Sequence, residues 1–139
     1  MQKLLRNYFD FTNKNVVILG GSKGIGLTIT KELINLGATV IIVSRTKPNL
    51  NVVFYKCDFE NLQEVKEVAK KIKKDYKKNW AIVNALAITI PSNEKIQLPE
   101  IFEKIINVNL VNHYYFISGM VSTVEVGGSI LNISSIYGD

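Results

Sequence analysis

The stretch that decides the fold is Asn15-Val16-Val17-Ile18-Leu19-Gly20-Gly21-Ser22-Lys23-Gly24-Ile25-Gly26. A short apolar run ends directly in glycines, and an apolar pattern of helical type follows over residues 27–36. Gly37 comes just after that pattern, where glycine typically ends a helix. The stretch therefore predicts a strand over residues 15–19, a glycine-rich loop, and a helix over residues 27–36.

Glycines at a strand-to-helix turn are typical of loops that bind phosphates. They let the chain turn sharply, let its backbone approach a pyrophosphate, and let the helix pack tightly on the strand. The amides at the helix start then face the phosphates, and the helix dipole favours their charge. No Gly-Lys-Ser/Thr sequence ends this loop, so it is not a P-loop. A merely structural turn is the alternative; the predicted nucleotide-binding residues are Gly20, Ser22, Lys23, Gly24, Ile25 and Gly26.

The rest of the chain alternates between strand and helix patterns. Apolar runs at residues 40–43, 52–55, 80–83 and 129–133 predict strands, and periodic patterns at about 61–76 and 98–121 predict helices. The strand runs are continuously apolar, as in parallel sheets covered on both faces. We expect an α/β fold of Rossmann type, with a doubly wound parallel sheet in a three-layer α/β/α arrangement. One domain spans residues 1–139, with an N-terminal extension over 1–13, and the link 45–50 leaves little room for a helix.

Composition excludes several classes of function. The chain has 139 residues, 47% of them hydrophobic and 21% charged, as in globular proteins. Its net charge of +5 comes largely from one helical segment with a solvated lysine face, so no nucleic-acid partner is expected. The lysines of that face are Lys66, Lys70, Lys71, Lys73, Lys74, Lys77 and Lys78.

Metal, disulfide and membrane functions are not expected either. One histidine and one cysteine offer no metal cluster, and Cys57 lies in an apolar run that predicts a buried thiol. No apolar run approaches the roughly 18 residues that cross a bilayer. Residues 1–6 are too polar for a signal peptide. These features predict a cytoplasmic protein without a membrane or a metal.

The end of the second predicted strand indicates which dinucleotide binds. An NAD site usually has Asp or Glu there to bind the ribose 2′-hydroxyl. This chain has Ser44 and Arg45 instead, and a guanidinium can bind a 2′-phosphate. Lys23 adds a second cation, so the sequence predicts NADP(H) in preference to NAD(H). The alternative is that Arg45 is an ordinary solvated charge.

The spacing of Gly20, Gly24 and Gly26 resembles that of the short-chain dehydrogenase/reductase family, in its single-domain branch. The resemblance runs from about Lys14 to the end and covers the N-terminal portion of the family fold. Leu19 departs from it, because the family usually has threonine there. The resemblance implies that Asp58, followed by Phe59, accepts a hydrogen bond from the adenine amino group. A cap for the helix that starts near residue 61 is the alternative for Asp58.

The resemblance also implies site residues in the second half of the chain. Asn84 and Ala85 occupy the place of the family's Asn-Asn-Ala-Gly motif, but Ala87 replaces its glycine, and the Ala87 Cβ is expected to crowd the nicotinamide-side ribose. Asn109 matches the helix asparagine that holds a water in the proton relay; an ordinary polar helix residue is the alternative. Ser135, at the end of the fifth predicted strand, matches the catalytic serine that hydrogen-bonds the substrate carbonyl or alcohol.

The family's mechanism needs a tyrosine as general acid/base, with a lysine four residues later that lowers its pKa. The resemblance places this pair about a dozen residues beyond Ser135, and none of the six tyrosines before Asp139 has a lysine four positions on. We therefore expect the sheet to be truncated after its fifth strand and this chain alone to be inactive. The chain is then either a fragment or truncated product of a longer enzyme, or it self-associates as a homo-oligomer.

The predicted function is that of an NADP-dependent oxidoreductase, which transfers a hydride between NADP(H) and a small-molecule carbonyl or alcohol. A non-catalytic NADP-binding or regulatory module is the alternative. A Rossmann-like methyltransferase would need an acidic residue near positions 44 and 45, which the sequence does not have. The identity of the substrate and the direction of the reaction stay open.

Overall fold

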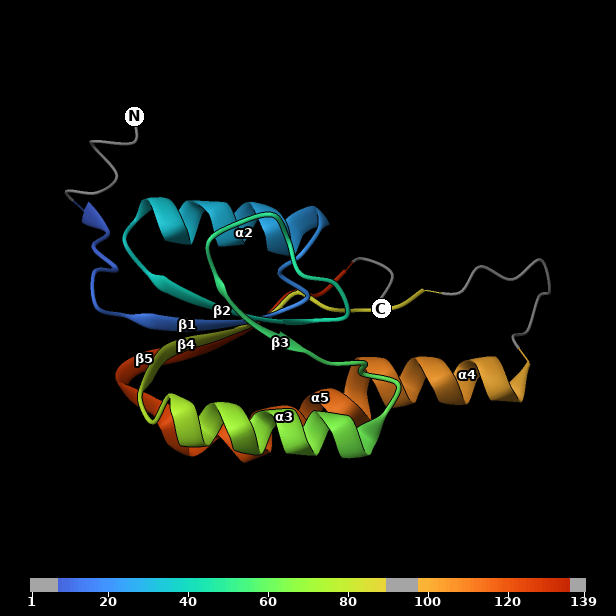
Figure 1. Ribbon diagram of the computed structural model, residues 1–139. Coiled ribbons are helices and arrows are strands. Elements are labelled where there is room, and N and C mark those ends of the chain that lie inside the picture. Colours follow the sequence, from blue (N-terminus) through green and yellow to red (C-terminus); the bar gives the residue numbers. More distant parts are fainter. Residues whose placement is uncertain (1–7, 90–97, 136–139) are drawn as a thin grey trace.

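A computed structural model describes residues 8–89 and 98–135, which form one five-stranded sheet with helices on both faces (Figure 1). The elements in chain order are β1 (Asn15–Leu19), α2 (Gly24–Asn35), β2 (Thr39–Ser44), β3 (Val53–Lys56), α3 (Leu62–Asp75), β4 (Asn79–Asn84), α4 (Pro99–Ile106), the π-helical segment η1 (Asn107–Val111), α5 (Asn112–Met120), the short 3₁₀ turn η2 (Val121–Thr123) and β5 (Val124–Asn132).

The sheet has the order β3-β2-β1-β4-β5, and every pair of neighbours is parallel. The chain builds β1, β2 and β3 outward, then crosses to the other side of β1 for β4 and β5. Helix α2 covers one face, while α3 and α5 cover the other (Figure 1). This confirms the predicted doubly wound fold. Such sheets bind ligands outside the carboxyl ends of their strands, where the strand order reverses.

Both faces of the sheet are buried, which explains the continuous apolar runs. Within β1, Val17 and Leu19 join the core under α3 and α5, whereas Val16 and Ile18 join the core under α2. Successive strand side chains point to opposite faces, so a strand covered twice needs an apolar residue at every position.

Two element boundaries differ from the sequence prediction. Helix α2 begins at Gly24, three residues earlier than predicted, because the last part of the glycine loop already forms its first turn. Strand β5 begins at Val124, five residues earlier, and its pairing with β4 shifts register between Asn79 and Ala81. Gly127 has a φ of 85°, a conformation that a local pattern does not reveal.

The predicted N-terminal extension is partly integrated into the fold. Residues 1–7 lie outside the described part of the chain. Phe11 packs against the core under α2, and its amide donates to the Leu36 carbonyl. In the described chain no helix joins β2 to β3, as the short link predicted.

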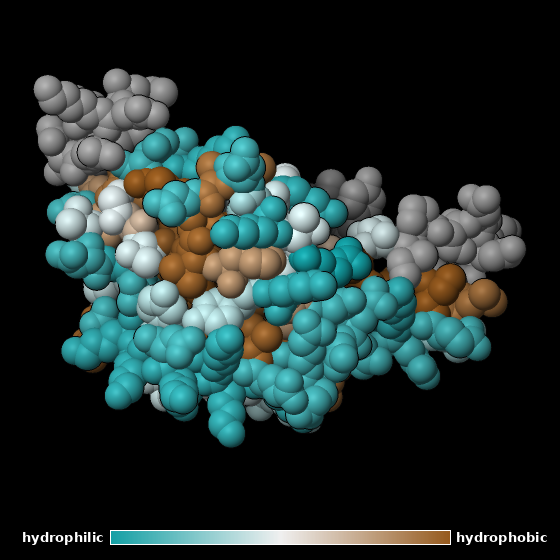
Figure 2. All heavy atoms as spheres, in the orientation of Figure 1, coloured by the Kyte–Doolittle hydropathy of each residue, from teal (hydrophilic) through white to brown (hydrophobic). Residues whose placement is uncertain are grey.

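The lysine-rich segment forms a surface helix, as predicted. Val65, Ala69 and Ile72 of α3 are buried, and the lysines are exposed. Figure 2 shows hydrophilic residues over the lower part of the molecule, where α3 lies. No helix within residues 8–89 and 98–135 is long and apolar enough to span a bilayer.

Candidate functional site

A cavity of about 570 Å³ lies at the carboxyl ends of the strands. Its volume is in the range of small-molecule sites. The glycine loop contributes Gly20, Ser22, Lys23, Gly24 and Ile25 to its lining. The segments after β2, β3 and β4 add Ser44, Arg45, Asp58, Phe59 and Ala85. Residues predicted from separate motifs therefore meet around one cavity.

The glycine loop leaves the N-terminus of α2 open toward an anion. Gly20 and Gly24 have φ values of 78° and 54°, which side-chain-bearing residues rarely adopt. A Cβ on Gly24 would meet no atom within 4 Å, so the backbone faces open space there. No side chain caps α2, and its first turn holds no acidic residue. The amides at the start of α2 can donate hydrogen bonds to a phosphate, and the positive end of the helix dipole favours its negative charge.

Gly26 has a different function from the other two glycines, because it does not line the cavity. A Cβ at this position would overlap the carbonyl oxygen of Gly20. Only glycine lets the first turn of α2 pack this closely against the end of β1. The predicted packing role of the third glycine agrees with this geometry.

Two cations lie on the rim of the cavity. Arg45 and Lys23 are both exposed, and both line the cavity. The one ion pair found within the described chain joins Lys104 to Glu60, so neither rim cation is neutralised by a carboxylate there. Ser44 is buried, and its hydroxyl donates to the Thr46 carbonyl at 2.9 Å, which shapes the turn that carries Arg45.

Asn84 lies behind the wall of the cavity and not on it. Its Nδ2 is 3.2 Å from Asn132 Oδ1 and 3.1 Å from His113 Nδ1, and its Oδ1 accepts the Leu86 amide at 3.4 Å. Burial lowers the pKa of His113, so the imidazole in this network is neutral at physiological pH. The network holds Leu86, which lines the cavity. Direct contact of Asn84 with a cofactor stays a prediction.

Asn109 hydrogen-bonds to the part of the cavity lining that follows β4, residues 85–88. Its Oδ1 accepts the Ile88 amide and its Nδ2 donates to the Ile88 carbonyl, both at 2.8 Å. Asn109 lies in the π-helical segment η1, and such segments are frequent at functional sites. Both ends of its side-chain amide are therefore hydrogen-bonded to the backbone of one cavity-lining residue. The predicted part of Asn109 in a proton relay stays a prediction.

Comparison with known proteins identifies the family. Residues 14–139 match the family model described as short chain dehydrogenase. This chain belongs to the short-chain dehydrogenase family. A coniferyl-alcohol dehydrogenase from a Pseudomonas species is 33% identical over 130 residues, which are 93% of this chain and 47% of that protein. The chain spans about half the length of the curated relatives it matches.

Solved structures share the fold. A short chain dehydrogenase from Leptospira borgpetersenii with bound NAD+ has a TM-score of 0.82 and 24% identity, and the match covers 96% of this chain and 55% of that one. The Pseudomonas aeruginosa RhlG/NADP complex has a TM-score of 0.83 and 18% identity, over 94% and 58% of the two chains. Both nucleotides thus occur among proteins of this fold.

The helix-cap alternative for Asp58 is wrong. The side chain that caps α3 is Asn61, whose Oδ1 accepts the amides of Gln63 and Glu64 at 3.1 and 3.2 Å. Asp58 instead accepts the Glu60 amide at 3.0 Å and lines the cavity. Its position fits the adenine contact that the family resemblance implies, and that contact stays a prediction.

Asn61→Ala is therefore expected to lower the free energy of unfolding by about 1 kcal/mol, because the first amides of α3 lose their acceptor. Asp58→Ala is expected to lower it by about half as much or less, since this carboxylate holds one amide of an exposed turn. Urea denaturation of the two variants gives both values. The reverse ranking would restore Asp58 as the cap.

Ser135 follows β5 and does not line the cavity. The parallel pairing of β4 and β5 places it at the same edge of the sheet as the glycine loop. Its catalytic role stays a prediction. Cys57 is fully buried, which confirms the predicted buried thiol, and this burial raises its pKa to about 12.

The sequence reasoning missed Asn112. This residue of α5 is buried, and its Nδ2 donates to the carbonyl of Phe59. The sequence does contain a signal for it, because the buried side of η1 and α5 has one residue at every fourth position. These residues are Val108, Asn112, Phe116 and Met120. A polar residue in an otherwise apolar row needs a hydrogen-bond partner.

Proposed function

We propose that the chain is the nucleotide-binding part of an NADP(H)-dependent oxidoreductase. The enzyme transfers a hydride between the nucleotide and a small-molecule carbonyl or alcohol. The observation that carries the proposal is one cavity on which an uncapped helix N-terminus meets two cations, Lys23 and Arg45, without carboxylate partners in the described chain.

The residues present fit a dinucleotide with an additional phosphate. The amides of residues 22–25 would hold the pyrophosphate, because they lie at the positive end of the α2 dipole and the backbone at Gly24 faces open space. Arg45 and Lys23 would hold the 2′-phosphate, and Asp58 the adenine. The nicotinamide, when bound, supplies the hydride acceptor or donor. The segment 85–88 lines the remaining part of the cavity.

The proposal also gives roles to two residues in the second half of the chain. Ser135 hydrogen-bonds the substrate oxygen, and Asn109 takes part in proton transfer while it holds Ile88. The relative from Pseudomonas is named for an alcohol substrate, which agrees with the proposed class of reaction. Self-association belongs to the proposal as well, because β5 lies at the edge of the described sheet and its Val126 and Leu131 are exposed there.

Titration with NADPH and NADH tests the nucleotide. We expect NADPH to bind about 10- to 100-fold more tightly than NADH, since charge-assisted bonds to one phosphate distinguish the two. Nucleotide fluorescence gives the dissociation constants, and the shift in Tm checks them. If neither nucleotide changes the fluorescence or the Tm, the cavity is not a dinucleotide site.

A further inference from the structure

We propose that Asn112 is a positioning residue for nucleotide binding, which holds the adenine-side wall of the cavity in place. The adenine-side wall is the segment Asp58–Glu60, between β3 and α3. This inference rests on the proposed nucleotide function and adds a residue that itself lies outside the cavity lining.

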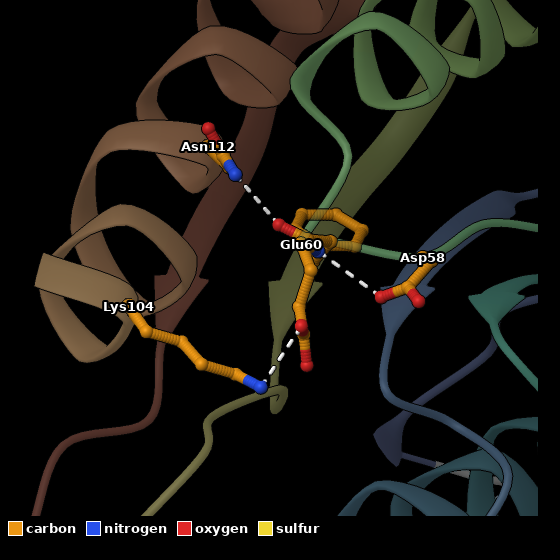
Figure 3. A network of polar contacts seen from close by, with 5 residues as sticks. Asp58, Glu60, Lys104 and Asn112 are labelled. Atoms are coloured by element: carbon orange, nitrogen blue, oxygen red, sulfur yellow. Dashed lines mark hydrogen bonds and ion pairs between the residues drawn. The ribbon is translucent and has the colours of Figure 1, made fainter. Parts of the chain in front are cut away.

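The wall is held from behind by a buried hydrogen bond. Asn112 Nδ2 donates to the carbonyl oxygen of Phe59 at 2.6 Å, across 53 residues of sequence. Asn112 is 3% exposed and Phe59 is 2% exposed, so water does not compete for either group. Figure 3 shows Asn112 reaching from its helix to the backbone of the wall, and Asp58 accepting the Glu60 amide on the side away from that helix.

This bond constrains the residue that is proposed to bind adenine. The Phe59 peptide follows Asp58 directly, so fixing the Phe59 carbonyl fixes where Asp58 lies on the cavity. The Asp58 carboxylate closes the same turn by accepting the Glu60 amide at 3.0 Å. Without the Asn112 amide, the Phe59 carbonyl would stay buried without a donor, and the wall would have to move to satisfy it.

A second contact supports the same wall from its exposed side. Lys104 Nζ of α4 lies 2.9 Å from Glu60 Oε2, and both side chains are roughly half exposed (Figure 3). Exposed ion pairs are screened by water and contribute little. The buried bond of Asn112 is therefore the stronger restraint.

One helical region holds both walls of the cavity. Asn109 in η1 binds the Ile88 peptide on the wall after β4, and Asn112, three residues later, binds the wall after β3. The π-helical turn that contains Asn109 lies directly before Asn112, so the two side chains come from adjoining turns of one helical region. Both walls are therefore hydrogen-bonded to the same helical region.

The test compares nucleotide binding by Asn112→Ala and by the wild-type chain. We expect Asn112→Ala to bind NADPH about tenfold more weakly, from the loss of one buried bond to the wall. Inorganic pyrophosphate, which has no adenine, is expected to keep its affinity within about twofold. Calorimetric titration at 10 °C, well below unfolding, separates binding from stability.

Asn79→Ala is the matched control. Asn79 is as buried as Asn112, and its Nδ2 donates to the Tyr76 carbonyl at 3.0 Å and to Thr123 Oγ1 at 2.9 Å. It begins β4, at the opposite end of the sheet from the cavity. We expect Asn79→Ala to lower the Tm but to leave the NADPH affinity unchanged. An equal loss of affinity in both variants would overturn the proposal, because it would show a general loosening.

The outcomes separate this inference from the proposed function. If the wild-type chain binds NADPH and Asn112→Ala binds it equally well, only the inference on Asn112 is overturned. If the wild-type chain binds no nucleotide, both are overturned. Should Asn112→Ala fail to fold, Asn112→Ser, whose hydroxyl is too short to reach the carbonyl, must show the same selective loss.

A double variant tests whether Asn112 acts through Asp58. In an Asp58→Ala background, Asn112→Ala is expected to weaken NADPH binding less than twofold, because the carboxylate that Asn112 positions is already absent.

Discussion

Gly26→Ala is expected to lower the free energy of unfolding by roughly 3 kcal/mol and to abolish NADPH binding. The new Cβ would overlap the Gly20 carbonyl oxygen, which is backbone and cannot turn away as a side chain could. Relief of the overlap requires α2 to move away from β1. The amides at the start of α2 would then no longer face the cavity that Gly20 and Gly24 shape.

Chemical denaturation gives the stability of this variant, and titration with NADPH gives its binding. Gly119→Ala is the matched control, because Gly119 lies in α5 and a Cβ there would meet only the Ala69 Cβ, at 3.5 Å. That change is expected to stabilise the chain by about 0.5–1 kcal/mol, since alanine favours the helix. A Gly26→Ala variant as stable as Gly119→Ala would contradict the close packing of α2 on β1.

Arg45→Asp is expected to weaken NADPH binding by about 100-fold or more while NADH binding changes little or improves. The substitution replaces a cation on the cavity rim by a carboxylate, which repels a 2′-phosphate and can accept a bond from a 2′-hydroxyl. The preference between the two nucleotides would therefore be lost or reversed. Parallel fluorescence titrations at constant ionic strength measure it.

Lys47→Asp is the control for net charge. Lys47 is exposed, lies two residues after Arg45, and does not line the cavity. The same change in charge there is expected to leave the ratio of the two affinities within about twofold, since exposed charges outside the site are screened. If both variants reduced NADPH binding equally, the effect would come from net charge and not from a 2′-phosphate contact.

Local features of the sequence were sufficient for the number and order of the strands, for the glycine loop, and for several residues that line the cavity. Residues 15–26 predicted a strand, a loop and a helix, and the structure confirms all three, with the helix starting at Gly24. Arg45 was found because it directly follows an apolar strand, and parallel strands bring their carboxyl ends to one edge. These inferences depend only on residues close together in the chain.

Inferences that depend on long-range partners were less complete. The role of Asp58 was open between an adenine contact and a cap of α3, and only the positions of the Gln63 and Glu64 amides assign the cap to Asn61. Asn84 was expected at the cofactor, yet its nearest polar partners are His113 and Asn132, 29 and 48 residues away. No local pattern specifies such partners.

The amino-acid sequence by itself determined the order of strands and helices, the glycine loop between β1 and α2, and the charge at the end of β2, because these follow from backbone conformation and from which residues can be buried. The tertiary structure alone decided what the buried polar side chains do. Asn109 and Asn112 are three residues apart, but they bind two different segments of the cavity lining. A buried amide must find a partner, and only the packing of α5 against the sheet decides which backbone group lies within its reach.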